Sequence, residues 1–128
     1  MKIPTILIVD DEQGQRENVR AYFEPRIRCT IAEASNGEEA IGFIKTKPCD
    51  VMILDIKMPE KGGLEVLDVA KDLPISTIVF TGWDSEEVYH ECKKRGVKEY
   101  IPKGGSLKVI GTKTIKELKR REQYFPLT

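Results

Sequence analysis

Three short runs of residues are apolar almost from end to end, and they constrain the fold more than any other feature of the chain. The runs read TILIVD at residues 5–10, VMILD at 51–55 and STIVFT at 76–81. Each is short and rich in β-branched residues, which is typical of strands that are covered on both faces. The three runs therefore predict the central strands of a parallel sheet.

Helix-length segments with an apolar stripe separate these runs. We expect five helices, at about residues 13–24, 36–47, 64–72, 84–95 and 106–124, and two more polar edge strands at residues 27–34 and 97–101. Asn36 caps the second helix with Glu39 three positions later, while Val88, Tyr89 and Cys92 share one face of the fourth. Strands that alternate with helices in this way predict an α/β domain with a parallel sheet and right-handed crossovers.

The length and charge of the chain limit the class of protein. Its 128 residues predict one domain over residues 1–128, with a core at about 4–123. The 21 basic and 21 acidic side chains cancel, which removes the main electrostatic argument for nucleic acid or an anionic membrane as a partner. The longest apolar runs hold four residues, far below the ~20 of a membrane helix, and the start lacks a secretory signal. Three cysteines without metal-type spacing suit reduced thiols, so we expect a soluble cytoplasmic protein.

Polar residues stand where the predicted strands end. The first strand ends in Asp10 and Asp11, the third in Asp55 and the fourth in Thr81, and Lys103 follows the fifth. Ligands of open α/β sheets collect beyond the carboxyl ends of the strands. We therefore expect three carboxylates, a hydroxyl and an ammonium group to share one rim of the sheet.

Such a group of side chains suits phosphoryl transfer. Close carboxylates repel one another unless a cation is present, and Mg²⁺ prefers oxygen ligands and phosphate. A carboxylate can be the nucleophile and form an aspartyl phosphate. Taken singly, each residue also has a structural explanation, because acidic residues cap helices, threonine suits strand ends and lysine is usually solvated. The ordered occurrence of all of them at successive strand ends favours the functional interpretation.

These residues and their surroundings resemble the receiver domain of two-component response regulators, the family of the bacterial chemotaxis regulator. The matching motifs are ILIVDDE at residues 6–12, DIKMP at 55–59 followed by Gly62-Gly63, VFTG at 79–82, and the segment that runs from Gly96 to YIPK at 100–103. The last helix matches in length and pattern alone. The resemblance implies a flavodoxin-like, doubly wound sheet of five parallel strands in the order 2-1-3-4-5, with five helices.

The resemblance also implies the roles of the residues around the phosphoacceptor, Asp55. Lys103 would pair with Asp55 and then with the phosphoryl group, to which Thr81 would donate its hydroxyl. Tyr100 would be the switch aromatic that rotates inward when Thr81 moves.

The metal ligands follow from the same resemblance. Asp11 would bind Mg²⁺ directly and Asp10 largely through water, with the backbone carbonyl of Lys57 as a further ligand. Mg²⁺ is accordingly the one cofactor that we expect.

The implied function is that of a switch in a two-component phosphorelay. A phosphohistidine on a sensor histidine kinase or a phosphotransfer protein would donate its phosphoryl group to Asp55. The face formed by the fourth helix, the fifth strand and the fifth helix would then change, and so control an output domain or a downstream protein. The same face could pair two copies as a dimer. The domain would catalyse only its own phosphorylation and dephosphorylation, and it would bind neither nucleic acid nor membrane directly.

Two other functions fit part of this pattern. A Mg²⁺-dependent phosphohydrolase could use the same aspartyl-phosphate chemistry, although the haloacid-dehalogenase-like group normally ends its first strand in Asp-x-Asp, and this strand ends in Asp-Asp-Glu. An interaction module could keep the fold without phosphorylation, but the complete set of site residues argues against it.

The sequence departs from the family pattern after the lysine. The family usually has proline there, often with a cis bond, whereas Lys103 is followed by Gly104-Gly105, for which we expect a different, trans geometry. The resemblance implies that Trp83 and Lys57 lie beside Asp55, at positions that in the family influence how fast the phosphoryl group is lost, and that a bulky Trp83 would shield this group from water.

Two further features receive structural interpretations. His90 is the single histidine, and its charged neighbours on the predicted helix indicate a surface position. The last helix carries a basic cluster, for which we expect a solvated face, with a docking surface for an acidic partner as the alternative; its members are Lys113, Lys116, Lys119, Arg120 and Arg121.

Overall fold

The chain forms a parallel sheet with helices on both faces. The structure is a computed structural model that describes residues 2–58, 62–82 and 85–127. Within these residues the elements, in chain order, are β1 (Thr5–Val9), α1 (Gln13–Phe23), β2 (Thr30–Ala34), α2 (Gly37–Thr46), β3 (Val51–Leu54), α3 (Gly63–Ala70), β4 (Ser76–Thr81), α4 (Glu86–Lys94), β5 (Glu99–Pro102) and α5 (Leu107–Arg120). The strands pair in the order β2-β1-β3-β4-β5, all parallel. The predicted doubly wound, flavodoxin-like fold is confirmed.

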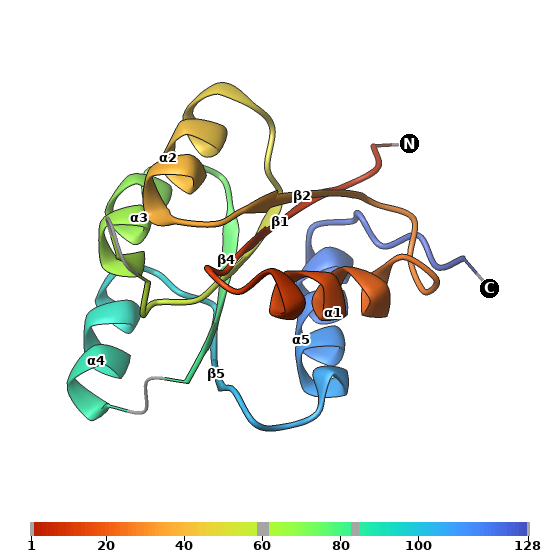
Figure 1. Ribbon diagram of the computed structural model, residues 1–128. Helices are drawn as coiled ribbons and strands as arrows, with labels where there is room; N and C mark the ends of the chain where they lie inside the picture. The colour runs from red at the N-terminus through yellow and green to blue at the C-terminus, as the bar shows by residue number, and fades with distance from the viewer. Residues whose placement is uncertain (1, 59–61, 83–84, 128) are drawn as a thin grey trace.

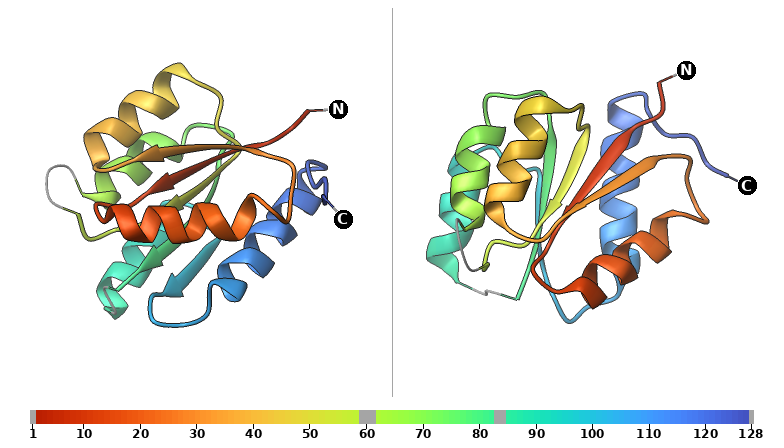
Figure 2. Two further views of the ribbon diagram at one scale, coloured as in Figure 1. Left: turned by 45° about the vertical axis from the view of Figure 1, so that its right-hand side comes forward. Right: turned by 45° about the horizontal axis from the view of Figure 1, so that its top comes forward.

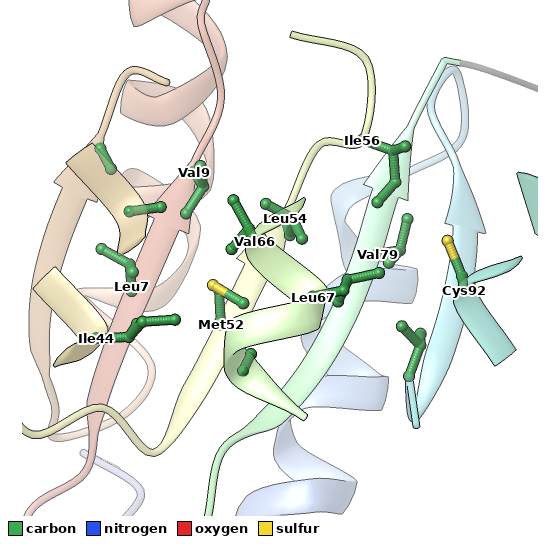
Figure 3. Close-up of a cluster of buried hydrophobic side chains, with 14 of the residues drawn as sticks. Leu7, Val9, Ile44, Met52, Leu54, Ile56, Val66, Leu67, Val79 and Cys92 are labelled. Carbon is green, nitrogen blue, oxygen red and sulfur yellow. The ribbon is translucent and has the colours of Figure 1, made fainter. Parts of the chain in front are cut away.

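Alternation along the strands builds two cores, one on each side of the sheet. Helices α1 and α5 lie over one face, while α2, α3 and α4 lie over the other (Figures 1 and 2). Ile6 and Ile8 pack with residues of α1 and α5, because successive strand side chains point to opposite faces. Leu7 and Val9 pack on the other side with residues of α2 and α3, as Figure 3 shows. The central strands are thus buried on both faces, which explains their apolar sequences.

The strand register brings the polar strand ends together. Val9 of β1 pairs with Leu54 of β3, so Asp10 and Asp55 both follow the ends of paired strands. Thr81 of β4 pairs with Pro102 of β5, which places Lys103 one residue beyond Thr81 at the same rim. The predicted convergence at the carboxyl ends is therefore confirmed.

The observed bounds differ most from the predicted ones at the start of β2 and at the end of α5. Helix α5 ends at Arg120, and Glu122 has a positive φ of 60°, which turns the chain back. The N–H of Leu127 then donates to the carbonyl of Arg26 at 3.1 Å. Ile27 forms an antiparallel bridge with Pro126, so β2 starts at Thr30 and not at residue 27. The C-terminal segment after α5 thus pairs with residues 26 and 27. The apolar pattern had predicted residue 27 as part of the edge strand and the last helix as far as residue 124.

The helix starts follow the capping residues with one difference. Asn36 accepts a hydrogen bond from the N–H of Glu39 at 2.8 Å, as predicted, but the Glu39 carboxylate bonds Ser35 in place of Asn36. Ser85 caps α4, and the alternative start at residue 84 lies outside the described residues. The sequence pattern predicts one shared face for Val88, Tyr89 and Cys92, but Val88 and Cys92 are buried whereas Tyr89 is 39% exposed. No helix within the described part of the chain combines the length and apolarity needed to cross a bilayer.

Candidate functional site

Asp55 is the centre of the polar rim. It follows β3 directly and is 5% exposed. Its Oδ1 accepts hydrogen bonds from the hydroxyl of Thr81 at 2.9 Å and from the backbone N–H of Lys57 at 3.1 Å. Its Oδ2 accepts from Nζ of Lys103 at 3.0 Å. Three donors, from the last residue of β4 and from the loops after β3 and β5, therefore fix this carboxylate.

Lys103 joins Asp55 to a second buried carboxylate. Its Nζ also donates to Oδ2 of Asp10 at 2.7 Å, while Oδ1 of Asp10 accepts from the N–H of Glu12 at 2.9 Å. Burial acts to lower the pKa of Lys103, but the hydrogen bonds to Asp10 and Asp55 outweigh burial and raise that pKa above its usual value. The ammonium group is therefore charged at neutral pH.

Asp11 completes an acidic cluster that fits a divalent cation. Asp10, Asp11 and Asp55 each offer a carboxylate oxygen, and these oxygens lie within 4.8 Å of one another. The cluster brings three carboxyl groups together beside one ammonium group, that of Lys103, so a divalent cation would offset the excess of acidic side chains. Hard oxygen donors of this kind suit Mg²⁺, which keeps several waters and binds through few carboxylates. Asp11 is exposed and faces solvent, so such an ion could be reached from outside.

The cluster borders an open hollow at the carboxyl end of the sheet. The hollow has a volume of about 550 Å³, and its lining residues are Asp11, Glu12, Asp55, Lys57, Met58, Gly82 and Lys103. A Cβ added at Gly82 would meet nothing within 4 Å, so this residue leaves the mouth of the hollow open. The hollow therefore connects the surroundings of Asp55 with solvent.

The loop after Lys103 explains why proline is absent there. Gly104 has φ of 100°, whereas the proline ring holds φ near −65°. No cis peptide bond occurs among the described residues, in agreement with the expected trans geometry. The N–H of Lys103 donates to the carbonyl of Thr81 at 2.8 Å, which ties this loop to the end of β4. Lys103 thus reaches both carboxylates without the usual proline.

Of the two predicted switch residues, Thr81 contacts the site and Tyr100 lies on the neighbouring strand, paired with Val79. Thr81 is buried and contacts Asp55, as described above. Tyr100 is partly buried on β5, and its ring packs edge to face on Tyr89 of α4, with centroids 5.4 Å apart. The expected shielding by Trp83 falls on a residue outside the described part of the chain.

Sequence reasoning missed one basic residue that serves the site. Arg16 of α1 donates from Nη1 to the backbone carbonyl of Asp10 at 2.7 Å. The sequence shows only that Arg16 stands six residues after Asp10 in the following helix. This spacing does not predict a hydrogen bond to a backbone atom.

The other singled-out residues lie away from the site. The side chain of His90 is 63% exposed and 3.7 Å from Glu86, which confirms its surface position. The basic cluster of α5 is not uniformly solvated, because Arg121 pairs with buried Asp50 at 3.2 Å and Arg120 with Glu117 at 2.9 Å. The side chains of these two arginines are therefore engaged in ion pairs at the amino-terminal end of the sheet.

Comparisons of sequence with known proteins agree with one another. The family model described as the response regulator receiver domain matches residues 6–114. The chain is 34% identical over 102 residues to the nitrate/nitrite response regulator protein NarL of Escherichia coli, covering 77% of this chain and 47% of that protein. It is 30% identical over 119 residues to a cyclic di-GMP phosphodiesterase of Thermotoga maritima, covering 91% of this chain and 32% of that protein. The chain thus spans about a third to a half of the length of these curated relatives.

Solved structures share the same architecture. The receiver domain of the Francisella response regulator 1452 superposes with a TM-score of 0.80 at 25% identity, covering 92% of this chain and 98% of that one. A CheY-like response regulator receiver domain protein from Methanospirillum hungatei JF-1 gives a TM-score of 0.83 at 24% identity, covering 95% and 98%. This second likeness concerns the fold alone.

Proposed function

The chain belongs to the family of response regulator receiver domains, and from this premise we propose that it is a phosphorylation-dependent signalling switch. The proposed unit is residues 1–128, with a core at about 4–123. Asp55 accepts a phosphoryl group from a phosphohistidine on a sensor histidine kinase or a phosphotransfer protein. The change at Asp55 is passed to an output domain or a downstream protein.

The observation that carries the proposal is the set of donors around Asp55. Thr81, Lys103 and the N–H of Lys57 hold both carboxylate oxygens at hydrogen-bond distance, beside the open hollow. Phosphoryl transfer depends mainly on positioning and on neutralising the oxygens of the transferred group. Donors that already point at the acceptor supply both.

The transfer step follows from this arrangement. A carboxylate oxygen of Asp55 attacks phosphorus, the new P–O bond forms as the P–N bond to histidine breaks, and the electron pair of that bond stays on the imidazole nitrogen. Lys103 and Thr81, which now donate to the two carboxylate oxygens of Asp55, then donate to oxygens of the phosphoryl group attached to one of these oxygens. Each such charge-assisted hydrogen bond contributes about 1.5–3 kcal/mol.

Mg²⁺ is the proposed cofactor, and Asp10, Asp11 and the backbone carbonyl of Lys57 would hold it. When bound, the ion supplies positive charge that neutralises the transferred oxygens. Lys103 keeps Asp10 and Asp55 close together in the absence of the ion, since it hydrogen-bonds both. The site is therefore assembled before a donor arrives.

The switch runs through Thr81 and Tyr100. Moving an equilibrium from 1:99 to 99:1 takes about 5.5 kcal/mol. Thr81 and Lys103 already donate to Asp55, so their bonds contribute to this only by the amount by which the phosphoryl oxygens bind them more strongly than the carboxylate oxygens do. Thr81 is drawn toward the phosphoryl group, and Tyr100 rotates inward behind it. Because the Tyr100 ring packs on Tyr89 of α4, its rotation changes the surface of α4, β5 and α5. That surface is the proposed site of partner binding or dimer formation.

The relatives differ in the activities for which they are named but share the segment that this chain covers. One is a nitrate/nitrite response regulator and one is a cyclic di-GMP phosphodiesterase, and the chain covers 47% and 32% of them. The shared segment therefore supports the signalling step and neither of those activities. We propose that this domain works in the cytoplasm and does not itself bind nucleic acid or membrane.

Intact mass after treatment with acetyl phosphate tests the proposal. We expect one phosphoryl group per chain with Mg²⁺, little without it, and none in Asp55→Asn. Asp50→Asn is the matched control, because Asp50 is equally buried, at 5% exposure, but lies at the opposite end of the same strand. Phosphoryl uptake by Asp55→Asn would contradict the assignment. Repeated turnover of a phosphomonoester by the wild-type chain would support the phosphohydrolase alternative instead.

A further inference from the structure

One guanidinium group holds the peptide bond between Asp10 and Asp11. Nη1 of Arg16 donates to the carbonyl oxygen of Asp10 at 2.7 Å, and the N–H of Asp10 donates to the carbonyl of Ala34 at 3.1 Å. Both backbone polar groups of Asp10 are thus bound. Since a peptide unit is planar, fixing the Asp10 carbonyl also fixes the plane from which Asp11 departs.

The Arg16 side chain is itself held in place. Its Nε donates to Oε1 of Glu33 on β2 at 3.0 Å, and the side chain is 15% exposed. Arg20, one helical turn later, binds the other carboxylate oxygen of Glu33 at 2.8 Å. Glu33 therefore orients both arginines, but among the described residues only Arg16 of the two donates to the Asp10 carbonyl. Burial acts to raise the pKa of Glu33, and the two arginines outweigh burial and lower it.

We propose that Arg16 is a positioning residue for the divalent-cation site, and that it acts through the Asp10 carbonyl to set the direction of the Asp11 carboxylate. The proposal rests on the proposed function, because it assumes that this acidic cluster binds Mg²⁺. No hydrogen bond among the described residues joins Arg16 to Asp55. Partners that orient metal ligands typically change metal affinity about 10–100-fold when removed.

Charge and geometry predict opposite effects for the loss of Arg16. Removing a cation near an acidic cluster strengthens the binding of Mg²⁺ by Coulomb attraction alone. Losing the hydrogen bond to Asp10 frees the peptide and weakens binding. The direction of the change therefore separates a positioning role from a purely electrostatic one.

The test is a titration of the unphosphorylated chain with Mg²⁺ at constant ionic strength, in which a two-dimensional amide NMR spectrum is recorded at each Mg²⁺ concentration. The spectra report the fold and the affinity in the same sample, without any phosphoryl transfer. We expect Arg16→Met to weaken Mg²⁺ binding about tenfold or more. Arg20→Met is the matched control, because it breaks an ion pair with the same Glu33 but leaves the Asp10 carbonyl bond, and it should stay within about twofold of wild type. Arg16→Lys keeps the charge but lacks the forked guanidinium, so it should also bind more weakly.

Each outcome decides the proposal. Binding by Arg16→Met that equals or exceeds wild type overturns it, as does an equal loss in Arg20→Met. If Arg16→Met does not fold, Arg16→Lys decides in its place, and wild-type affinity in that variant overturns the proposal. Absence of Mg²⁺ binding in the wild-type chain overturns the proposed function together with the role of Arg16, whereas a defect confined to the Arg16 variants supports both.

Discussion

Gly63 packs against the backbone that carries Asp55, and we predict that Gly63→Ala impairs phosphorylation. A Cβ at this position would lie 2.6 Å from Cα of Ile56 and 3.0 Å from the carbonyl oxygen of Asp55. The N–H of Gly63 also donates to the carbonyl of Ile56 at 3.0 Å. Helix α3 therefore starts in direct contact with the loop after β3, and alanine would separate the two.

The size of the effect follows from these distances. Ordinary contact begins near 3.4 Å, so the backbone of Ile56 must retreat by about 0.8 Å from a Cβ at 2.6 Å. Overpacking of this kind costs about 1–3 kcal/mol, partly offset by the better helix propensity of alanine, about 1 kcal/mol. A displacement near 1 Å at a reacting group can lower a rate about a hundredfold. We expect phosphorylation of Asp55 to be slower by about tenfold to a hundredfold.

The assay is the rate of phosphorylation by acetyl phosphate with Mg²⁺, beside urea denaturation of the same samples. Gly62→Ala is the matched control, because its Cβ would lie 3.7 Å from the carbonyl oxygen of Ile56 and its φ of −71° suits alanine. It should react at nearly the wild-type rate. Equal rates and stabilities for the two variants would refute the reasoning.

Three further predictions concern stability, measured by urea denaturation. Thr114→Val should raise the free energy of unfolding by about 1 kcal/mol, because the Thr114 hydroxyl is buried without a hydrogen-bond partner among the described residues, and an unchanged or lower value would contradict this. Burial acts to raise the pKa of Asp50, but its hydrogen bonds, including those from Thr5 and Arg121, lower it. The stability from Asp50 is therefore present above about pH 4 and lost as the pH falls below it, so Asp50→Asn should be less stable than wild type at pH 7 and closer to it at pH 3. Gly104→Ala should cost about 1–3 kcal/mol because of its φ of 100°, and a cost near zero would argue against that backbone conformation.

The sequence predicts the elements whose environment is local and repetitive. Strands covered on both faces must be apolar throughout, so β1, β3 and β4 are visible as runs. Once the sheet is parallel, the rim at which Asp10, Asp55 and Lys103 meet follows from topology. The order of the residues along the chain already indicates that these side chains meet, and the structure adds the lengths of their hydrogen bonds.

Features that depend on single long side chains or single dihedral angles were not predictable. Periodicity places Tyr89 on the inner face of α4, yet the ring lies against Tyr100 at the surface. The bond from Arg16 to the Asp10 carbonyl depends on one rotamer and on Glu33 of a separate strand. At Glu122, with φ of 60°, the chain reverses direction so that Pro126 pairs with Ile27, and no pattern of residues predicts this turn.

The most direct test of the account identifies the residue that carries the phosphoryl group. Borohydride reduction of the phosphorylated chain converts an acyl phosphate to an alcohol, and peptide mapping then locates the reduced residue. The account predicts reduction at Asp55, dependent on Mg²⁺ during phosphorylation. Reduction at Asp10 or Asp11, or a stable phosphoryl group on His90, would contradict it.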